Sequence, residues 1–220
     1  MLYNIYKKMT SKYKEKELDI KVEDLPFLKF FTSRYSMTVR VPAQNTYDLS
    51  KKQGMSFFNL TTACLLKAIN EIPEFRYRIK NGKVIEYEKI NAVSPIMQPD
   101  HSILEIEIKP TSEFNSLQEW NNYVDNKKKN IKDNQFLVDP SLRDVLPIAN
   151  FSCITWINFD SMTNVISEPH QIMPVITWGK LVDGKISISL TASHVFIFGW
   201  QFKLFFEKAE EYLTHPEKLF

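Results

Sequence analysis

The clearest hydrophobic pattern in the chain lies between residues 56 and 71. Apolar residues recur there at intervals of three and four positions, which brings them onto one side of an α-helix. Ser56 stands where a side chain can cap the first turn, and Pro73 follows soon after the last one. The pattern predicts an amphipathic helix whose buried residues are Phe57, Leu60, Cys64, Leu65, Ala68 and Ile69.

Two further stretches have helical spacing. The first is more polar and places Leu117, Trp120, Val124 and Ile131 on one side. The second follows Gly199 and is strongly aromatic on its predicted buried side. That side consists of Phe202, Phe205, Phe206, Ala209 and Leu213.

Alternation of apolar and polar residues marks the predicted strands. Between residues 104 and 108, leucine and isoleucine alternate with glutamate, the period of a strand with one solvated face. Between residues 186 and 192 apolar residues alternate with serine and threonine, and segments 151–158 and 173–179 also have the character of strands. Asn81-Gly82 predicts a type I′ hairpin, and Asp183-Gly184 a turn before the last strand.

This order of helices and hairpins indicates an α+β fold, a two-layer sandwich of helices on a mixed sheet. Residues 7–19 are rich in Lys, Glu and Ser, a composition that indicates a solvated arm. We therefore expect an N-terminal polar arm over residues 1–22 and a single domain over residues 23–220. A chain of 220 residues is of a size that one core can hold.

Charge and composition narrow the range of partners. The chain has 28 basic and 26 acidic residues, a net charge of +2, which is too small to favour nucleic acid. No run of about 18 apolar residues predicts a membrane span, so the expected location is the cytoplasm. Cys64 and Cys153 have no metal-ligand spacing, and we expect both to be reduced and buried, with no metal bound.

Four histidines are candidates for a general base: His101, His170, His194 and His215. His101 and His215 lie in predicted turns or loops. His194 ends an apolar strand just before a turn and a helix, where functional groups are often held by rigid elements. Taken alone, this position fits an ordinary half-buried histidine better than a catalyst.

Three sequence motifs, one of which contains His194, resemble motifs of a known protein family. Residues 191–199 (TASHVFIFG) resemble the His-His-x-x-x-Asp-Gly signature of the chloramphenicol acetyltransferases, with His194 at the second histidine. Residues 155–161 (TWINFDS) and 174–180 (PVITWGK) are similar to two more motifs of that family, in the same order. The helix ending in Pro-Glu-Phe-Arg at residues 73–76 and its hairpin also match, so the resemblance covers residues 23–213.

The resemblance implies the fold of the coenzyme A-dependent acyltransferases, a homotrimer and a mechanism. A histidine takes the proton of an acceptor hydroxyl, which attacks the thioester of acetyl-CoA, the co-substrate. His194 would be this base and Ser161 would stabilise the oxyanion. Thr177 would lie near the small-molecule acceptor, and Lys180 would approach the coenzyme A phosphates.

Structural roles for these residues stay open beside the catalytic ones. Ser161 can end a turn, Thr177 can fill a strand, and Lys180 can be a solvated lysine. The aromatic residues Phe27, Phe30, Phe31 and Tyr35 can line an acceptor pocket or pack a core, of which the core is the expected role.

The sequence also departs from the family pattern. The signature aspartate, which pairs in the family with an arginine near the N-terminus, is Phe198 here, and the first histidine is Ser193. The arginine position falls on Glu23 or Asp24, depending on how the N-terminal motif is aligned. Removing both partners of a buried ion pair together can be nearly neutral for stability.

Two functions follow from these observations. The first is an acetyl-CoA-dependent O-acetyltransferase acting on chloramphenicol or another hydroxyl compound. The second is a non-catalytic trimeric relative that binds a small ligand, which the loss of the aspartate and arginine permits.

Overall fold

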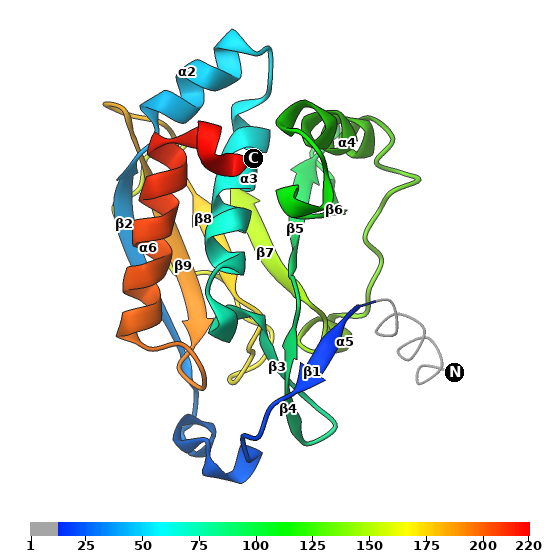
Figure 1. Ribbon diagram of the computed structural model, residues 1–220, viewed down its shortest axis with the longest axis vertical. Coiled ribbons are helices and arrows are strands. Elements are labelled where there is room, and N and C mark those ends of the chain that lie inside the picture. The colour runs from blue at the N-terminus through cyan, green and yellow to red at the C-terminus, as the bar shows by residue number, and fades with distance from the viewer. Residues whose placement is uncertain (1–12) are drawn as a thin grey trace.

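The described part of this computed structural model, residues 13–220, is built around a mixed six-stranded sheet (Figure 1). The strand order is β2-β9-β8-β7-β5-β6. β7 runs parallel to both β5 and β8, and the remaining neighbours are antiparallel. The strands are β2 (Arg34–Pro42), β5 (Asn91–Met97), β6 (Ile103–Ile108), β7 (Ile148–Cys153), β8 (Val175–Trp178) and β9 (Lys185–Ser193).

Helices cover one face of this sheet, so the α+β sandwich expected from the sequence is confirmed. α3 and α6 pack against each other and lie over the sheet, α2 lies across their upper ends, and α4 lies by β6 (Figure 1). The helices are α2 (Gln44–Lys52), α3 (Phe57–Asn70), α4 (Leu117–Lys129), α5 (Pro140–Arg143) and α6 (Gly199–Thr214). Short 3₁₀ turns are η1 (Val22–Asp24), η2 (Pro26–Lys29), η3 (Pro73–Arg76), η4 (Thr111–Glu113) and η5 (Pro216–Leu219).

The helices begin and end near the predicted residues, with differences in capping. Ser56 occupies the N-cap position of α3, but its side chain makes no capping hydrogen bond. Ser116 does cap α4, because its Oγ accepts the backbone N–H of Glu119 at 3.2 Å. Ile131, predicted to lie on that helix, follows its end and is buried in the core.

Both predicted tight turns are present. Asn81 and Gly82 have φ angles of 52° and 73°, as a type I′ turn requires. Asp183 and Gly184 have φ angles of 51° and 72° in the turn before β9. Glycine is favoured at the second position of each turn because it enters this region without a steric penalty.

A second, three-stranded sheet contains a strand that the sequence did not predict. β1 (Glu15–Glu17) joins β4 (Lys83–Tyr87), which also pairs with β3 (Tyr77–Lys80). β1 lies in the segment interpreted as a solvated arm, of which residues 1–12 lie outside the described part of the chain, and the three residues of β1 are exposed. Cross-strand ion pairs hold it, including Lys80–Glu15 and Lys83–Glu17, which is why so polar a segment can form a strand.

The two faces of β9 are both buried, for different reasons. Ile186, Ile188 and Leu190 face the helices and are 0% exposed. The hydroxyl residues between them face the other side, where the loop over residues 154–174 covers them. Ser189 Oγ, for example, donates to the backbone oxygen of Met162 at 2.7 Å, so the polar side of the alternation packs against backbone rather than solvent.

A buried arginine joins the hairpin to the sheet. The Arg78 side chain is 0% exposed, and its guanidinium donates to backbone oxygens that include those of Phe75 and Leu146, at 3.0 and 2.9 Å. Burial lowers its pKa to about 10, so it is still charged at neutral pH. Carbonyl dipoles therefore solvate this charge inside the protein.

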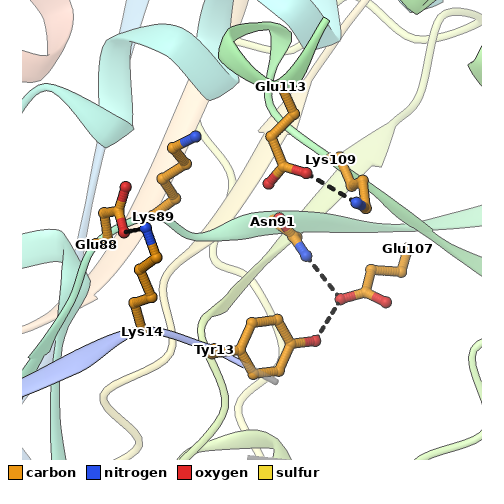
Figure 2. Close-up of a pocket in the computed structure, with 8 residues that line it drawn as sticks. All are labelled: Tyr13, Lys14, Glu88, Lys89, Asn91, Glu107, Lys109 and Glu113. Atoms are coloured by element: carbon orange, nitrogen blue, oxygen red, sulfur yellow. Dashed lines mark hydrogen bonds and ion pairs between the residues drawn. The ribbon is translucent and has the colours of Figure 1, made fainter. Parts of the chain in front are cut away.

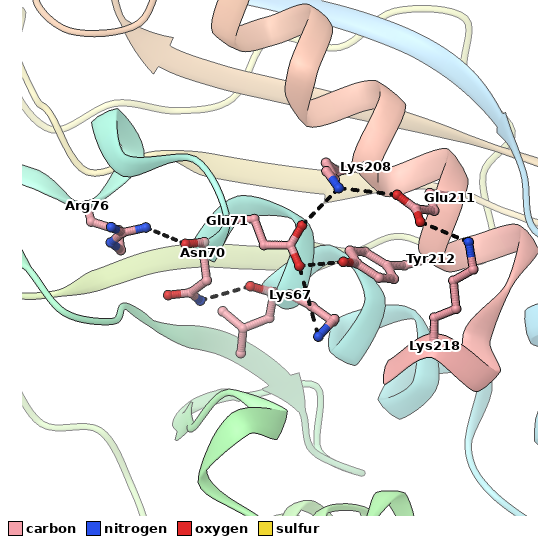
Figure 3. A network of polar contacts seen from close by, with 9 residues as sticks. Lys67, Asn70, Glu71, Arg76, Lys208, Glu211, Tyr212 and Lys218 are labelled. Carbon is pink, nitrogen blue, oxygen red and sulfur yellow. Dashed lines mark hydrogen bonds and ion pairs between the residues drawn. The ribbon is translucent and has the colours of Figure 1, made fainter. Parts of the chain in front are cut away.

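A polar network lies where α3 meets α6 (Figure 3). Lys208 bridges Glu71 and Glu211 with N–O distances of 3.2 and 3.3 Å, and Lys218 pairs with Glu211 at 3.0 Å. The Tyr212 hydroxyl also donates to Glu71. These contacts fasten the C-terminal helix at its solvent-facing side, away from the end of β9.

Candidate active site

His194 follows the last residue of β9 and begins the turn into α6. Its backbone N–H donates to the oxygen of Ser33 at 2.7 Å, which ties it to the start of β2. The turn closes through the N–H groups of Phe196 and Ile197, which donate to Ser193 O at 3.3 and 3.0 Å. The Tyr35 hydroxyl donates to Ile197 O at 2.9 Å. A turn held by these backbone and side-chain hydrogen bonds thus carries the histidine.

The imidazole of His194 is enclosed by aromatic rings. Phe27 stacks on it with centroids 4.0 Å apart and planes 5° apart, and Tyr35 stacks at 4.7 Å and 26°. Two rings so close and nearly parallel would collide if they shared one face, so they lie on opposite faces. Phe198 meets the imidazole edge-on at 4.8 Å and 76°. These contacts restrict the ring to one orientation.

The two ring nitrogens of His194 are in different environments. Nδ1 is buried and has no hydrogen-bond partner within residues 13–220. Nε2 has no such partner either but is not among the buried atoms, so it reaches the surface. Of the two nitrogens, Nε2 is therefore the one available to a substrate.

Behind His194 lies a chain of hydrogen bonds that the sequence did not suggest. Ser33 Oγ lies 2.8 Å from Ser193 Oγ, and His170 Nδ1 lies 3.2 Å from Ser33 Oγ. Ser33 N–H also donates to Pro169 O at 3.2 Å. Ser193 occupies the position of the family's first histidine, and its small hydroxyl completes this link between β2, β9 and the loop over residues 167–173.

Ser161 lies far from His194 within one chain. It is exposed, and its neighbour Met162 contacts the middle of the sheet through Thr38 and Ser189. Ser189 precedes His194 by five positions on β9, which corresponds to about 16 Å along a strand. The structure does not bring the predicted base and the predicted oxyanion donor together in a single subunit.

Thr177 does lie near Ser161. It is in β8, where it pairs with Ser152 of β7 and Ser189 of β9. Its buried hydroxyl donates to Asn164 Oδ1 at 2.6 Å, and Asn164 Nδ2 in turn donates to Thr191 Oγ1 at 2.9 Å. Asn164 thus fixes the Thr177 hydroxyl, a contact for which the sequence offered no signal.

Lys180 is exposed just after β8, and a close backbone contact sets its position. Its N–H donates to Ile157 O at 2.8 Å. A Cβ on the preceding residue, Gly179, would lie 2.9 Å from both Ile157 O and the Phe159 ring. Only glycine permits this approach, so Gly179 joins the motif over residues 155–161 to the motif over residues 174–180.

Within residues 13–220, the positions that depart from the family pattern form no ion pair. Phe198 is 42% exposed and packs edge-on against both Phe27 and His194. Glu23 and Asp24 lie in η1 and are exposed. Phe27 and Tyr35 of the N-terminal aromatic stretch contact His194, whereas Phe30 and Phe31 are exposed rather than in a core.

The other histidines and the cysteines have no comparable surroundings. His101 is exposed in a turn with φ 65°, and His215 is exposed after α6, as the sequence suggested. Cys64 is buried, but Cys153 is only partly so, which corrects the expectation of full burial. Burial raises the pKa of both thiols to about 12, so neither supplies a thiolate at neutral pH.

A polar pocket elsewhere on the protein offers no such chemistry (Figure 2). Tyr13 Oη and Asn91 Nδ2 both donate to Glu107 at 2.8 Å, and Lys109 pairs with Glu113 at the same distance. Among residues 13–220, no group of three or more His, Cys, Asp or Glu side chains is placed to hold a metal ion. Within the same residues, no helix is long and apolar enough to cross a membrane.

Solved structures share this fold. A chloramphenicol acetyltransferase superposes with a TM-score of 0.75 at 25% identity, covering 91% of this chain and 100% of the other. A probable dihydrolipoamide acetyltransferase of Listeria monocytogenes superposes with a TM-score of 0.60 at 16% identity, covering 93% and 95%. The fold is therefore that of the coenzyme A-dependent acyltransferases.

Sequence comparison gives the family. The chloramphenicol acetyltransferase family model matches residues 18–207. A chloramphenicol acetyltransferase of Bacillus pumilus is 24% identical over 161 residues, which is 69% of each chain. This chain belongs to the chloramphenicol acetyltransferase family, whose members are enzymes of the acyltransferase kind, and the resemblance identified from its motifs is confirmed.

Proposed function

We propose that this protein is an acetyl-CoA-dependent O-acetyltransferase whose active site is shared between subunits of a homotrimer. The observation that carries the proposal is the separation of two groups on one sheet. His194 has an accessible Nε2 at the end of β9, whereas the Ser161 loop contacts the same strand at Ser189, about 16 Å back along it. A second copy brings the two together if His194 of one subunit faces Ser161 of its neighbour.

In this site His194 Nε2 takes the proton of an acceptor hydroxyl. The hydroxyl oxygen bonds to the thioester carbonyl carbon of acetyl-CoA, and the Ser161 hydroxyl donates to the oxygen that becomes negative. The tetrahedral intermediate then collapses with cleavage of the carbon–sulfur bond. The leaving thiolate recovers the proton from the imidazolium, and the acetyl ester is released.

Two other residues have binding roles in the proposal. Thr177, held by Asn164 next to the Ser161 loop, lies on the acceptor side. Lys180 is exposed, and no ion pair engages it within residues 13–220, so its ammonium can approach the phosphates of coenzyme A. Gly179 holds it beside the loop that leads to Ser161.

A complementation experiment tests the shared site. His194→Ala and Ser161→Ala should each abolish most thiol release from acetyl-CoA with an acceptor, the serine variant by about 10²–10³-fold. Random mixing of the two inactive chains should restore about a quarter of the wild-type sites, because a site needs one intact residue from each neighbour. Light scattering should give a mass three times the 25.9 kDa of one chain. No recovery in stable mixed trimers would contradict the shared site.

The alternative is a trimeric relative that binds a small ligand without catalysis. Two observations favour it: Nδ1 of His194 has no hydrogen-bond partner among residues 13–220, and Phe198 replaces the aspartate. In that case His194→Ala and the wild type would have equal thiol release. Binding of coenzyme A or of an acceptor would then persist without turnover.

A further inference from the structure

Two serines hold the turn that carries His194. The backbone N–H of His194 donates to Ser33 O at 2.7 Å, and that of Val195 donates to Ser193 Oγ at 3.3 Å. The next two N–H groups of the turn both donate to Ser193 O, at 3.3 and 3.0 Å. Four consecutive N–H groups therefore end on Ser33 or Ser193, so these two residues set the path of the backbone from which the imidazole projects.

The hydroxyls of the two serines lie inside the subunit. Ser33 is 3% exposed and Ser193 is 1% exposed in the single chain. Their Oγ atoms lie 2.8 Å apart, and Ser33 Oγ also lies 3.2 Å from His170 Nδ1. A neighbouring subunit has almost no surface of either serine to contact. Both hydroxyls therefore have to find their partners within this chain.

The available acceptors decide which way the two hydroxyl hydrogens point. A serine has one hydrogen to donate, and a buried one needs an acceptor for it. Among residues 13–220, Ser33 Oγ is the only acceptor in hydrogen-bonding position for the Ser193 hydroxyl, because its other contact, the Val195 N–H, is a donor. The Ser193 hydroxyl thus donates to Ser33, and the Ser33 hydroxyl donates to His170 Nδ1. The opposite direction would leave the buried Ser193 hydrogen without an acceptor.

This direction also fixes the tautomer of His170. Nδ1 has to be unprotonated to accept from Ser33, so the imidazole hydrogen is on Nε2. The side chain is partly exposed, and Nε2 is not among the buried atoms that lack a partner, so water can reach this N–H. The backbone supports the same contact, because the Ser33 N–H donates to Pro169 O at 3.2 Å.

We infer that His170, with Nδ1 unprotonated, is a positioning residue for His194 and acts by accepting the Ser33 hydroxyl. Its effect on turnover rests on the proposed function, whereas its effect on the orientation of the His194 ring does not. Without this acceptor the Ser33 hydroxyl turns back toward Ser193, and the two serines no longer hold the turn in a single arrangement. All of these residues belong to one subunit.

Two substitutions separate the acceptor of His170 from the bulk of its side chain. In His170→Asn the amide oxygen is attached to Cγ, as Nδ1 is in histidine, so an acceptor stays near the same place. His170→Leu is of similar size but has no acceptor. His215→Leu, the same change at an exposed histidine after α6, is the matched control.

Three readouts are compared. NMR of protein with ¹⁵N-labelled histidine gives the wild-type tautomer of His170 in alkaline solution, where imidazoles are neutral. The ring-proton shifts of His194 report its stacking, because the rings of Phe27 and Tyr35 lie 4.0 and 4.7 Å away. His170→Asn and His194→Ala assign the two sets of signals. Thiol release from acetyl-CoA with chloramphenicol, sorbitol or glucose gives kcat and KM.

The expected wild-type tautomer has no proton on Nδ1 of His170. The ring shifts of His194 should move in His170→Leu and stay at the wild-type values in His170→Asn and His215→Leu. In His170→Leu, kcat should fall about three- to tenfold with KM unchanged, the factor that one neutral hydrogen bond provides. His170→Asn should restore kcat.

A proton on Nδ1 of His170, or equal His194 ring shifts in His170→Leu and the wild type, overturns the inference and leaves the proposed function standing. If the ring shifts move as expected but the wild type releases no thiol, the positioning of His194 is supported and the proposed function is contradicted. If His170→Leu does not fold, the wild-type tautomer and His170→Asn decide. A His194 ring displaced in His170→Asn then overturns the inference.

Discussion

The ring of Phe27 lies flat on the imidazole of His194, with centroids 4.0 Å apart and planes 5° apart. Phe27 comes from η2, before the first strand of the large sheet, whereas His194 follows the last strand. The N-terminal turn thus helps to orient the candidate base. The aspartate of the family pattern is Phe198 here, and the rings of Phe27 and Phe198 contact the imidazole.

Replacing Phe27 with alanine should lower kcat by about 3–10-fold and leave KM nearly unchanged, since an aromatic pair contributes about 0.5–1.5 kcal/mol beyond its buried area. Phe27→Tyr keeps the ring and should retain activity. Steady-state kinetics on both variants checks this. A loss that appears only in KM would mean that Phe27 contacts substrate instead of orienting His194.

Ser33→Ala should destabilise the fold by about 1–3 kcal/mol, because it removes the buried hydroxyl between Ser193 and His170. Urea denaturation measures the change. Ser102→Ala is the control, since the hydroxyl of Ser102 bonds to Asp100 in an exposed turn. Equal stability of the two variants would show that the buried link is not needed.

Arg78→Met should cost at least about 3 kcal/mol, because several buried carbonyl oxygens lose their donor at once. Arg40→Met, at an exposed position of β2, should change stability very little. Thermal or urea unfolding of both variants decides the matter. A stable Arg78→Met protein would mean that water or another donor replaces the guanidinium.

Stability should fall above pH 10, in part because of Tyr35. Burial raises its pKa to about 12, so the native state holds this proton more tightly than the unfolded state does. The stabilising contribution is complete below the ordinary tyrosine value of about 10 and is lost as the pH rises through about 12. Unfolding of wild type and Tyr35→Phe across this range should give a shallower decline for the variant. Parallel curves would rule out a contribution from Tyr35.

Phe198→Asp should destabilise the turn by only about 1 kcal/mol, because the loss is mainly that of an aromatic contact. Phe198 is 42% exposed, so the new carboxylate can be hydrated instead of being buried without a partner. Adding Asp24→Arg or Glu23→Arg should recover about 0.2–1 kcal/mol, the value of an exposed ion pair. Thermal melts of the singles and doubles measure the coupling. A cost of several kcal/mol for Phe198→Asp would mean that the site is buried in the assembled protein.

Local patterns were enough to predict much of this fold from the sequence. The spacing in α3 and α6, the Asn81-Gly82 turn and the alternation in β9 each depend on residues close together in the chain. The sequence did not predict β1, because this strand is stabilised by ion pairs to Lys80 and Lys83 in another segment. The polar composition of residues 15–17 does not indicate that these residues will pair with that segment.

The candidate site was predictable only as separate motifs. The motifs identified His194, Ser161, Thr177 and Lys180, but not the strand register that separates the first two. The contacts of Ser33, His170 and Asn164 join residues up to 160 positions apart. No local pattern encodes such contacts, because they depend on how the loop over residues 154–174 lies on the sheet.

The alternation along β9 also fixes the spacing between Ser189 and His194. A slip of one residue would turn Ile188 toward the polar loop and Ser189 toward the helical core, so the strand has a single favourable register. The loop that leads to Ser161 is fastened to Ser189, and His194 follows at the strand's end. An insertion between these two residues would therefore lengthen the spacing by about 3.3 Å and reverse the side of the sheet on which the histidine emerges. In the proposed shared site, the number of residues in this short stretch would set the distance that a neighbouring subunit has to span.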